Sequence, residues 1–321
     1  MFTHIRLLLL ILLCVLLSGC YTWDDDACIC CSGTKVTVLN IILDVSMIPY
    51  SPVSGKAAVD EVENPDVRAI IGIYSKAGNL VERKVFNVGK AGSIVYSVND
   101  TIQLPAAEYR LVFWADYVLP GSVEDLYYDT ENLAYIQTIG DYRGNTELKD
   151  AFTTYLDVNL EVGNGSVIPE NIILHRPFSK YQIIATDLRE YLSVGGVSDV
   201  ADIRCRISYP GLVYDSYDAV QGKPADVWNG GSFSGQTHIL SLDELLLGWD
   251  YIWATDEASM LKANVRIYDT KGHVINQIDQ VEIPYMRNRL TTVKGAFLTE
   301  ESDSGIGVVT DYEGNIDIPL P

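Results

Sequence analysis

Basic residues and histidines are scarce in this 321-residue chain. It has 23 Lys and Arg against 43 Asp and Glu, a formal net charge of −20, and 4 His. Such an excess of acidic residues repels phosphate backbones, which excludes nucleic acid as the main partner. The histidines are scattered, without an HExxH pattern or a second ligand at metal-binding spacing, so the sequence predicts no metal site.

Catalytic motifs are missing as well. The segment 231–235 has the two glycines of a nucleophile elbow, but its central residue is Phe233 instead of a nucleophile. Neither a GxGxxG loop nor a P-loop occurs. Acidic residues are so numerous that choosing two as a general acid and base would be arbitrary. We therefore expect a protein that is not an enzyme and needs no cofactor.

A long apolar run occurs only at the front of the chain. The eleven residues 7–17 are too few for a permanent membrane span but suit the hydrophobic part of a signal peptide. The run ends in Leu17-Ser18-Gly19-Cys20, which looks like a lipobox. Cleavage between Gly19 and Cys20 would leave Cys20 acylated, and several acyl chains hold a protein on a membrane. An ordinary secretory signal is the alternative.

Three aspartates, 24–26, follow the expected lipid anchor. They resemble the acidic signal that sends lipoproteins of gut and oral anaerobes to the outer face of the outer membrane. As a plain charge run they would be a solvated tether. We expect residues 1–19 to be the signal peptide, 20–34 a tether, and the mature protein to be lipid-anchored in the outer membrane and exposed at the cell surface.

The six cysteines leave the disulfide state open. Cys14 lies within the leader, and Cys20 is the expected lipidation site. The cluster Cys28, Cys30 and Cys31 is too cramped for good disulfide geometry within itself. Cys205 lies on the apolar side of an alternating segment, so we expect a buried free thiol.

Alternation with a period of two residues dominates the rest of the chain and predicts a mainly β fold. The clearest expected strands are 109–117, 152–162 and 181–185. Turn residues separate the alternating segments, at 76–79, 99–100, 163–165 and 269–272. Two short helices are expected, at 187–192 and, from a capping box at Ser241 and Glu244, at 241–247.

A domain boundary is expected at 175–176, where one strand pattern ends and another begins. It leaves about 140 residues on each side, the size of one β-sandwich. We therefore predict two tandem β-sandwich domains of transthyretin-like or immunoglobulin-like type, 35–175 and 176–321, behind the lipoprotein signal peptide.

Several stretches resemble one family, the fimbrillins, which are lipoprotein precursors of type V pili. The stretch with Tyr109, Trp114 and Asp116 is similar to the strand that closes the core of their first domain, and the one with Arg176 and Pro177 to the junction that opens the second. In order, the similar segments are 104–117, 127–130, 142–145, 150–152, 174–180 and 283–299.

The resemblance implies a structural fimbrial subunit, or an anchor or accessory fimbrillin, whose partners are other fimbrial subunits. In the family a protease removes the first strand by cutting after a basic residue in the next loop, and a neighbour's strand fills the exposed edge. Here the first strand would be 35–45, the candidate cleavage sites Lys56 and Arg68, and the donor strand 307–320.

Two further expectations concern the surface. Asp100-Thr101-Ile102 resembles the O-glycosylation acceptor of surface proteins in these anaerobes, which makes Thr101 a candidate site. The alternative function is a surface-exposed lipoprotein that binds host or bacterial surface ligands, a glycan or a host protein, without polymerising. Trp228, Trp249 and Trp253 could then stack on sugars, although core packing explains most of them.

Overall fold

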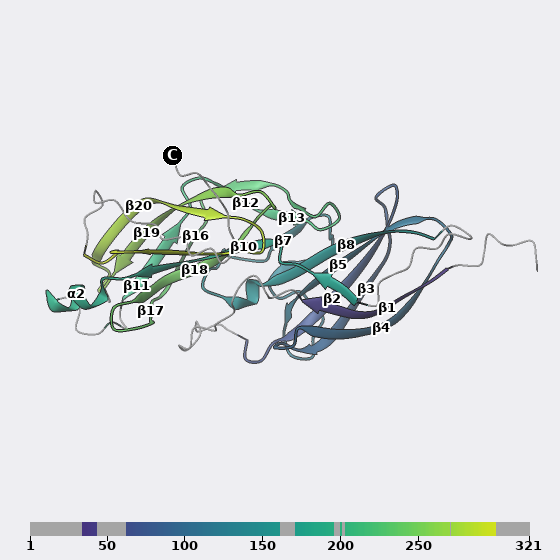
Figure 1. Cartoon of the computed structure of the whole chain (residues 1–321), viewed down its shortest axis with the longest axis horizontal. Coiled ribbons are helices and arrows are strands. Elements are labelled where there is room, and N and C mark those ends of the chain that lie inside the picture. The colour runs from purple at the N-terminus through teal and green to yellow at the C-terminus, as the bar shows by residue number, and fades with distance from the viewer. Residues whose placement is uncertain are drawn as a thin grey trace, which may run out of the picture.

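The computed structural model describes residues 34–43, 62–160, 171–195, 200, 203–269 and 271–299. Strands dominate these residues, which confirms the mainly β prediction. None of the helices in this part of the chain is both long and apolar enough to cross a membrane. The molecule is elongated, with two groups of sheets side by side along its long axis (Figure 1).

The first group consists of two sheets. One has the strand order β4-β1-β9 and the other β3-β2-β5-β8. Their strands are β1 (Thr34–Leu43), β2 (Asp66–Ser75), β3 (Leu80–Lys90), β4 (Val95–Leu104), β5 (Glu108–Val118), β8 (Ala151–Asn159) and β9 (Asn171–Leu174). The turn between β2 and β3 lies where the sequence predicts it, with Gly78 at a φ of 82°.

The second group has a sheet of order β17-β18-β10-β21 and one of order β16-β11-β19-β20. Its strands are β10 (Phe178–Ala185), β11 (Arg204–Ser208), β16 (Ser232–Gln236), β17 (His238–Ile239), β18 (Leu245–Trp253), β19 (Ser259–Tyr268), β20 (Val274–Tyr285) and β21 (Leu290–Gly295). The helix α2 (Leu188–Ser193) lies at the far end of this group (Figure 1).

The two groups repeat one strand order. In each, the first strand lies between an antiparallel neighbour and, on its other side, the last strand of the group, which runs parallel to it. In each group the other sheet is antiparallel, and its first two strands are the third and then the second strand of the repeat. The sets β4-β1-β9 and β3-β2-β5-β8 thus correspond to β18-β10-β21 and β16-β11-β19-β20.

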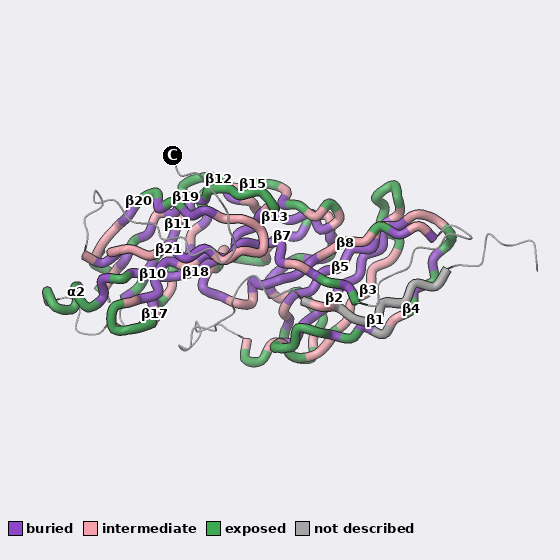
Figure 2. Tube along the Cα trace, viewed as in Figure 1, coloured by how far each residue is buried: buried purple, intermediate pink, exposed green. Residues whose placement is uncertain are grey.

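Each group has its own hydrophobic core between its two sheets. In the first, buried residues such as Ile71, Leu111 and Phe113 face Ile102 and Ile172. In the second, Ile183 and Val293 face inward-pointing residues of β11 and β19. Buried residues alternate with exposed ones on the outer strands (Figure 2), as the period-two pattern predicts.

A third core joins the two groups. Trp114 of β5 meets Tyr128, Phe178 and Trp253, and the rings of Phe178 and Trp253 stack at 4.1 Å. A small sheet with the order β14-β13-β7-β6 crosses the same junction, because β7 (Ile136–Thr138) pairs with β13 (Ser216–Asp218). Its outer strands are β6 (Tyr128–Asp129) and β14 (Lys223–Pro224), and a separate hairpin pairs β12 (Leu212–Tyr214) with β15 (Val227–Asn229).

The expected strands 109–117, 152–162 and 181–185 are found as β5, β8 and β10. Of the two expected helices, α2 is confirmed, and that at 241–247 is wrong. Ser241 Oγ does accept hydrogen bonds from the backbone of Asp243 and Glu244, but the chain then enters β18. The segment Leu245–Leu247 forms a strand because its apolar side chains are buried on both faces. Leu245 and Leu247 fill one core, and Leu246 packs on the other face.

Candidate functional site

The strand β1 and its two neighbours form the candidate site. β1 pairs along almost its whole length with β4, from Thr34 opposite Leu104 to Ile42 opposite Val95. On its other side Asn40–Leu43 pair in parallel with Asn171–Leu174. β1 is therefore the interior strand that links β4 and β9 in their sheet.

The walls around β1 are apolar. Tyr96, Val98, Ile102 and Leu104 of β4 and Ile172 and Leu174 of β9 are all at most 5% exposed. They pack on the opposite sheet, whose inward side chains include Ile73 and Phe113. A strand laid between β4 and β9 thus satisfies two rows of backbone groups and covers a hydrophobic core.

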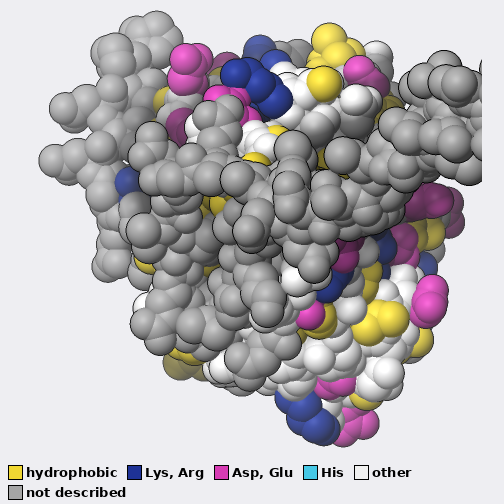
Figure 3. Space-filling view, turned by 90° about the vertical axis from the view of Figure 1, so that its right-hand side faces the viewer, with side chains coloured by type: hydrophobic (Ala, Val, Ile, Leu, Met, Phe, Trp, Pro, Cys, Tyr) yellow, Lys and Arg dark blue, Asp and Glu magenta, His cyan; other side chains and the backbone are white. Residues whose placement is uncertain are grey.

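Figure 3 looks at the end of the molecule that holds this group of sheets. Where its surface is described, acidic and basic side chains are interspersed with hydrophobic ones.

An open cavity of about 530 Å³ near the junction is lined by Tyr74, Lys76, Glu108, Arg110 and Asp157, among others. Its charged side chains form two ion pairs, Lys76 with Glu108 and Arg110 with Asp157. These ion pairs give the charged groups of the cavity wall a structural role.

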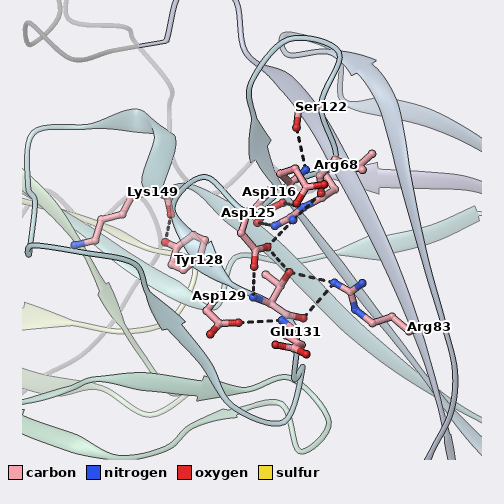
Figure 4. A network of polar contacts seen from close by, with 12 residues as sticks. Arg68, Arg83, Asp116, Ser122, Asp125, Tyr128, Asp129, Glu131 and Lys149 are labelled. Atoms are coloured by element: carbon pink, nitrogen blue, oxygen red, sulfur yellow. Dashed lines mark hydrogen bonds and ion pairs between the residues drawn. The ribbon is translucent and has the colours of Figure 1, made fainter.

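Arg68, one of the two candidate cleavage sites, lies inside β2 and is 1% exposed. Its guanidinium donates to both carboxylate oxygens of Asp116, at 2.9 and 2.6 Å, and to Asp125 Oδ1 at 2.6 Å (Figure 4). Burial alone would raise the pKa of Asp125, but hydrogen bonds from Thr130 and Arg68 outweigh it and lower that pKa. A protease reaches the bond after Arg68 only if β2 leaves its sheet.

Further polar contacts lie between this network and the junction. Asp125 also accepts a hydrogen bond from Thr130 Oγ1 at 2.7 Å, and the hydroxyl of Tyr128 donates to the backbone carbonyl of Lys149 (Figure 4). Lys149 Nζ in turn lies 2.6 Å from Asp250 Oδ1. Burial lowers the pKa of Lys149.

Thr101 is exposed, but it lies in β4 opposite Thr37 of β1 and not in a turn. The turn expected at 99–100 is therefore wrong. Asp100 instead forms an ion pair with Lys84 at 2.5 Å. The register of β4 with β1 shifts between Val38, which lies opposite Asp100, and Asn40, which lies opposite Ser97. The strand is therefore irregular at the position of the expected turn.

Several expected features lie outside the described residues: the signal peptide with Gly19 and Cys20, the cysteines 28, 30 and 31, Lys56, the turn at 163–165 and the donor segment 307–320. Cys205 is buried and has no disulfide, and burial raises the pKa of its thiol well above the ordinary value, as expected for an inert core cysteine.

The three described histidines lie in different elements of the fold. His175 is joined to Thr153 by two backbone hydrogen bonds, His238 is half-buried in β17, and His273 contacts Asp269 at 3.1 Å in the turn before β20. Across the described residues no group of His, Cys, Asp and Glu is arranged to hold a metal ion. Trp249 and Trp253 are buried and Trp228 packs against a core, so these three serve packing first.

Sequence reasoning missed the buried ion pairs of the junction. Arg176 binds Asp150 through two hydrogen bonds of 2.7 Å, with both side chains 1% exposed. Asp250 accepts from Lys149, Tyr142 and Tyr209. Asp116 and Asp250 each interrupt a run of apolar residues within a strand, and that pattern is the signal that could have indicated a buried basic partner.

Comparison with solved structures finds adhesion and fimbrial proteins, the class that the sequence motifs resemble. The fimbrial anchor protein Mfa2 from Porphyromonas gingivalis has 11% identity and a TM-score of 0.39, with 76% of this chain and 82% of that chain covered. A candidate adhesin from Bacteroides ovatus has 12% identity and a TM-score of 0.46, with 76% and 78% covered.

A candidate cell adhesion protein from Bacteroides eggerthii has 13% identity and a TM-score of 0.42, with 89% of this chain and 93% of that chain covered. No curated protein matches the chain. One family model, described as a family of unknown function, DUF6562, matches residues 33–321. This match spans all of the sequence after the expected tether, and the chain belongs to the DUF6562 family.

Proposed function

We propose that this protein is a fimbrial subunit, or an anchor or accessory member of a fimbrium, exported as a lipoprotein acylated at Cys20. It would consist of two tandem β-sandwich domains, 35–175 and 176–321, and would assemble by strand exchange at the outer membrane surface. The proposal is supported by the lipobox, by the fimbrillin-like motifs in their order, and by the strand order that recurs in the two groups of sheets.

The observation that carries strand exchange is the position of β1. It is the first described strand and lies between β4 and β9, so its departure would expose two unpaired edges and the apolar walls around them. Such a groove is costly when empty and templates the addition of another strand. The C-terminal segment 307–320, with Val308, Thr310, Ile316 and Ile318 as alternating residues, is the donor that we propose.

Cleavage after Lys56 fits this scheme better than cleavage after Arg68. Lys56 stands among Ser, Pro and Gly in the sequence between β1 and β2, whereas the side chain of Arg68 is buried in its ion pairs with Asp116 and Asp125. A cut after Lys56 would release β1 and leave β2 in its sheet. A subunit that is not cut would keep β1 and its lipid, as an anchor or accessory member would.

Intact mass and N-terminal sequencing of the mature protein test the processing. An N-terminus at residue 57 supports a polymerising subunit, and an acylated Cys20 as the sole N-terminus contradicts the shaft role and leaves the anchor role. A matched pair, Lys56→Ala and Lys90→Ala, separates specific cleavage from general trimming. The first should abolish release of β1, and the second, which alters an exposed lysine at the end of β3, should leave it unchanged.

Strand exchange itself is tested on the full chain with a specific protease site placed at residue 56. After cleavage, a peptide of sequence 307–320 should displace the 1–56 fragment and co-elute with the remaining chain. A control peptide with Asp at positions 308 and 316 should not, because charged groups cannot enter an apolar groove. Failure of both peptides to bind the cleaved chain would contradict the mechanism.

The second candidate function is a surface protein that binds a glycan or host protein without polymerising. One observation favours it: Arg204, Arg206 and Arg266 are exposed on the outer face of the second group of sheets, and none forms an ion pair with the acidic residues that the structure describes.

A further inference from the structure

Three arginines are exposed on the outer face of the sheet β16-β11-β19-β20. Arg204 and Arg206 belong to β11 and Arg266 to β19, and residues that alternate with them, such as Cys205 and Val265, point into the core. None of the three has an acidic partner within 4.0 Å among the described residues, although the chain carries 43 acidic and 23 basic residues. We call these three residues the arginine face.

The register places two of these charges side by side. Arg206 is directly opposite Arg266 in the pairing of β11 with β19. Like charges at opposed positions destabilise a sheet, and no ion pair among the described residues offsets this repulsion. Other exposed or half-buried cations do have acidic partners, for example Lys84 with Asp100 and Lys294 with Glu244.

A hollow of about 160 Å³ lies over this pair. It is lined by Arg206, Ser208, Asn264, Arg266, Gln277 and Asp279. Arg206 Nη2 donates to Ser232 Oγ at 3.1 Å, while Gln277 Nε2 donates to both carboxylate oxygens of Asp279, at 3.0 and 3.1 Å. The hollow has room for one anionic group, and a guanidinium binds a carboxylate or sulfate through two parallel hydrogen bonds.

We propose that the arginine face binds an acidic polysaccharide through its carboxylate or sulfate groups. Serine, asparagine and glutamine side chains surround the arginines and match the hydroxyls of a sugar chain, and Tyr268 lies opposite Arg204. An acidic peptide fits less well. β11 and β19 are interior strands and offer no free edge, and the hollow has no apolar side chain in its lining to hold an anchor residue. The proposal goes beyond strand exchange and does not depend on it.

The test measures binding of polygalacturonate to the uncleaved chain by isothermal titration calorimetry, with neutral dextran as the control polymer. Arg206→Ala/Arg266→Ala should weaken binding by about tenfold or more, because charge-assisted hydrogen bonds are lost. The matched double variant Lys90→Ala/Lys223→Ala removes the same charge from exposed positions elsewhere and should change affinity by less than about twofold at 0.15 M salt.

Two substitutions sharpen the result. Arg206→Lys/Arg266→Lys keeps the charge but removes the planar forks, so binding should fall although the electrostatic potential is kept. Asp279→Asn removes the negative charge in the hollow and should strengthen binding a few-fold.

No binding of polygalacturonate, or equal losses in the two alanine double variants, would overturn the proposal. Equal binding of poly-glutamate, lost in the same variant, would also overturn it in favour of an acidic protein partner. Strand exchange uses the cleaved chain and another surface, so its failure can be told apart from failure of this proposal.

Discussion

The strands β1 and β10 occupy the same place in the two groups of sheets, but the segments of sequence around them differ. Both are interior strands with an antiparallel neighbour on one side and a parallel one on the other. Seven of the eight residues of β10 are buried, and its Lys180 and Tyr181 bond to Glu147 and Tyr209. Arg176, two residues before β10, is fixed by Asp150.

β1 has a different setting. It is the first described strand, and in the sequence it is followed by the candidate cleavage site Lys56 before β2 begins at Asp66. The backbone of β1 pairs with β4 and β9, and β10 packs into the core at the junction through Phe178. One topology thus contains β10, which polar and aromatic side-chain contacts join to the junction, and β1, which the sequence places between the expected lipid anchor and a candidate cleavage site.

Removing the buried ion pair that precedes β10 should have the largest effect on stability. Arg176→Ala leaves the carboxylate of Asp150 buried without its partner, which costs about 3–5 kcal/mol of unfolding free energy. Urea denaturation followed by tryptophan fluorescence measures this loss, because Trp114 and Trp253 report on the junction.

The control is Arg189→Ala, which removes an arginine paired with Asp243 at the surface, with side chains 65% and 53% exposed. It should cost less than about 1 kcal/mol. Equal effects of the two substitutions would contradict the idea that the junction is locked by its buried ion pair.

Substitutions that create a cavity in the first or in the second group of sheets should have different effects on local opening. Ile102→Ala in β4 and Ile183→Ala in β10 each remove a buried side chain, at 1% and 0% exposure, and each costs about 2–5 kcal/mol. In Ile102→Ala, amide hydrogen exchange should rise mainly in β1, β4 and β9, since local opening precedes global unfolding there. In Ile183→Ala it should rise throughout the second group of sheets.

Native-state exchange with mass spectrometry resolves these segments. If Ile102→Ala accelerates exchange in β18 and β21 as much as in β4, the two groups of sheets open as one cooperative unit. In that case β1 is not a separately displaceable strand.

Much of the architecture could be predicted from the sequence because the period-two pattern is long and regular. The strands 109–117 and 152–162 follow from it directly, and so does the inward position of Cys205. The errors at 241–247 and 99–100 have one cause. Local capping and turn chemistry favoured one structure, and tertiary pairing with β10 and β1 selected another.

The site was less accessible to such reasoning. Single buried charges such as Arg68 look like surface residues in a pattern, and their partners Asp116 and Asp125 are 48 and 57 residues away in the chain. The arginine face was not predicted for the same reason. Arg206 and Arg266 are 60 positions apart, and the register of β11 and β19 brings them together.

The smallest predicted effect concerns a surface link across the junction. Arg110 binds both carboxylate oxygens of Asp157, at 2.6 and 2.7 Å, and donates to the carbonyl of Val220 in the second half. The hydrogen bonds from Arg110 lower the pKa of Asp157. The pair is therefore stabilising above the unfolded pKa of about 3.9 and loses its effect as the pH falls through the lower folded value.

Because the side chain of Asp157 is 62% exposed, Asp157→Asn should cost less than about 1 kcal/mol at pH 7. The difference from the parent should decrease as the pH falls below about 3.9 and disappear below the folded pKa, as unfolding curves at pH 7 and at a series of lower pH values would reveal. A larger cost, or one that persists at low pH, would mean that surface pairs contribute to locking the junction. The junction would then depend less on its buried ion pairs than the structure indicates.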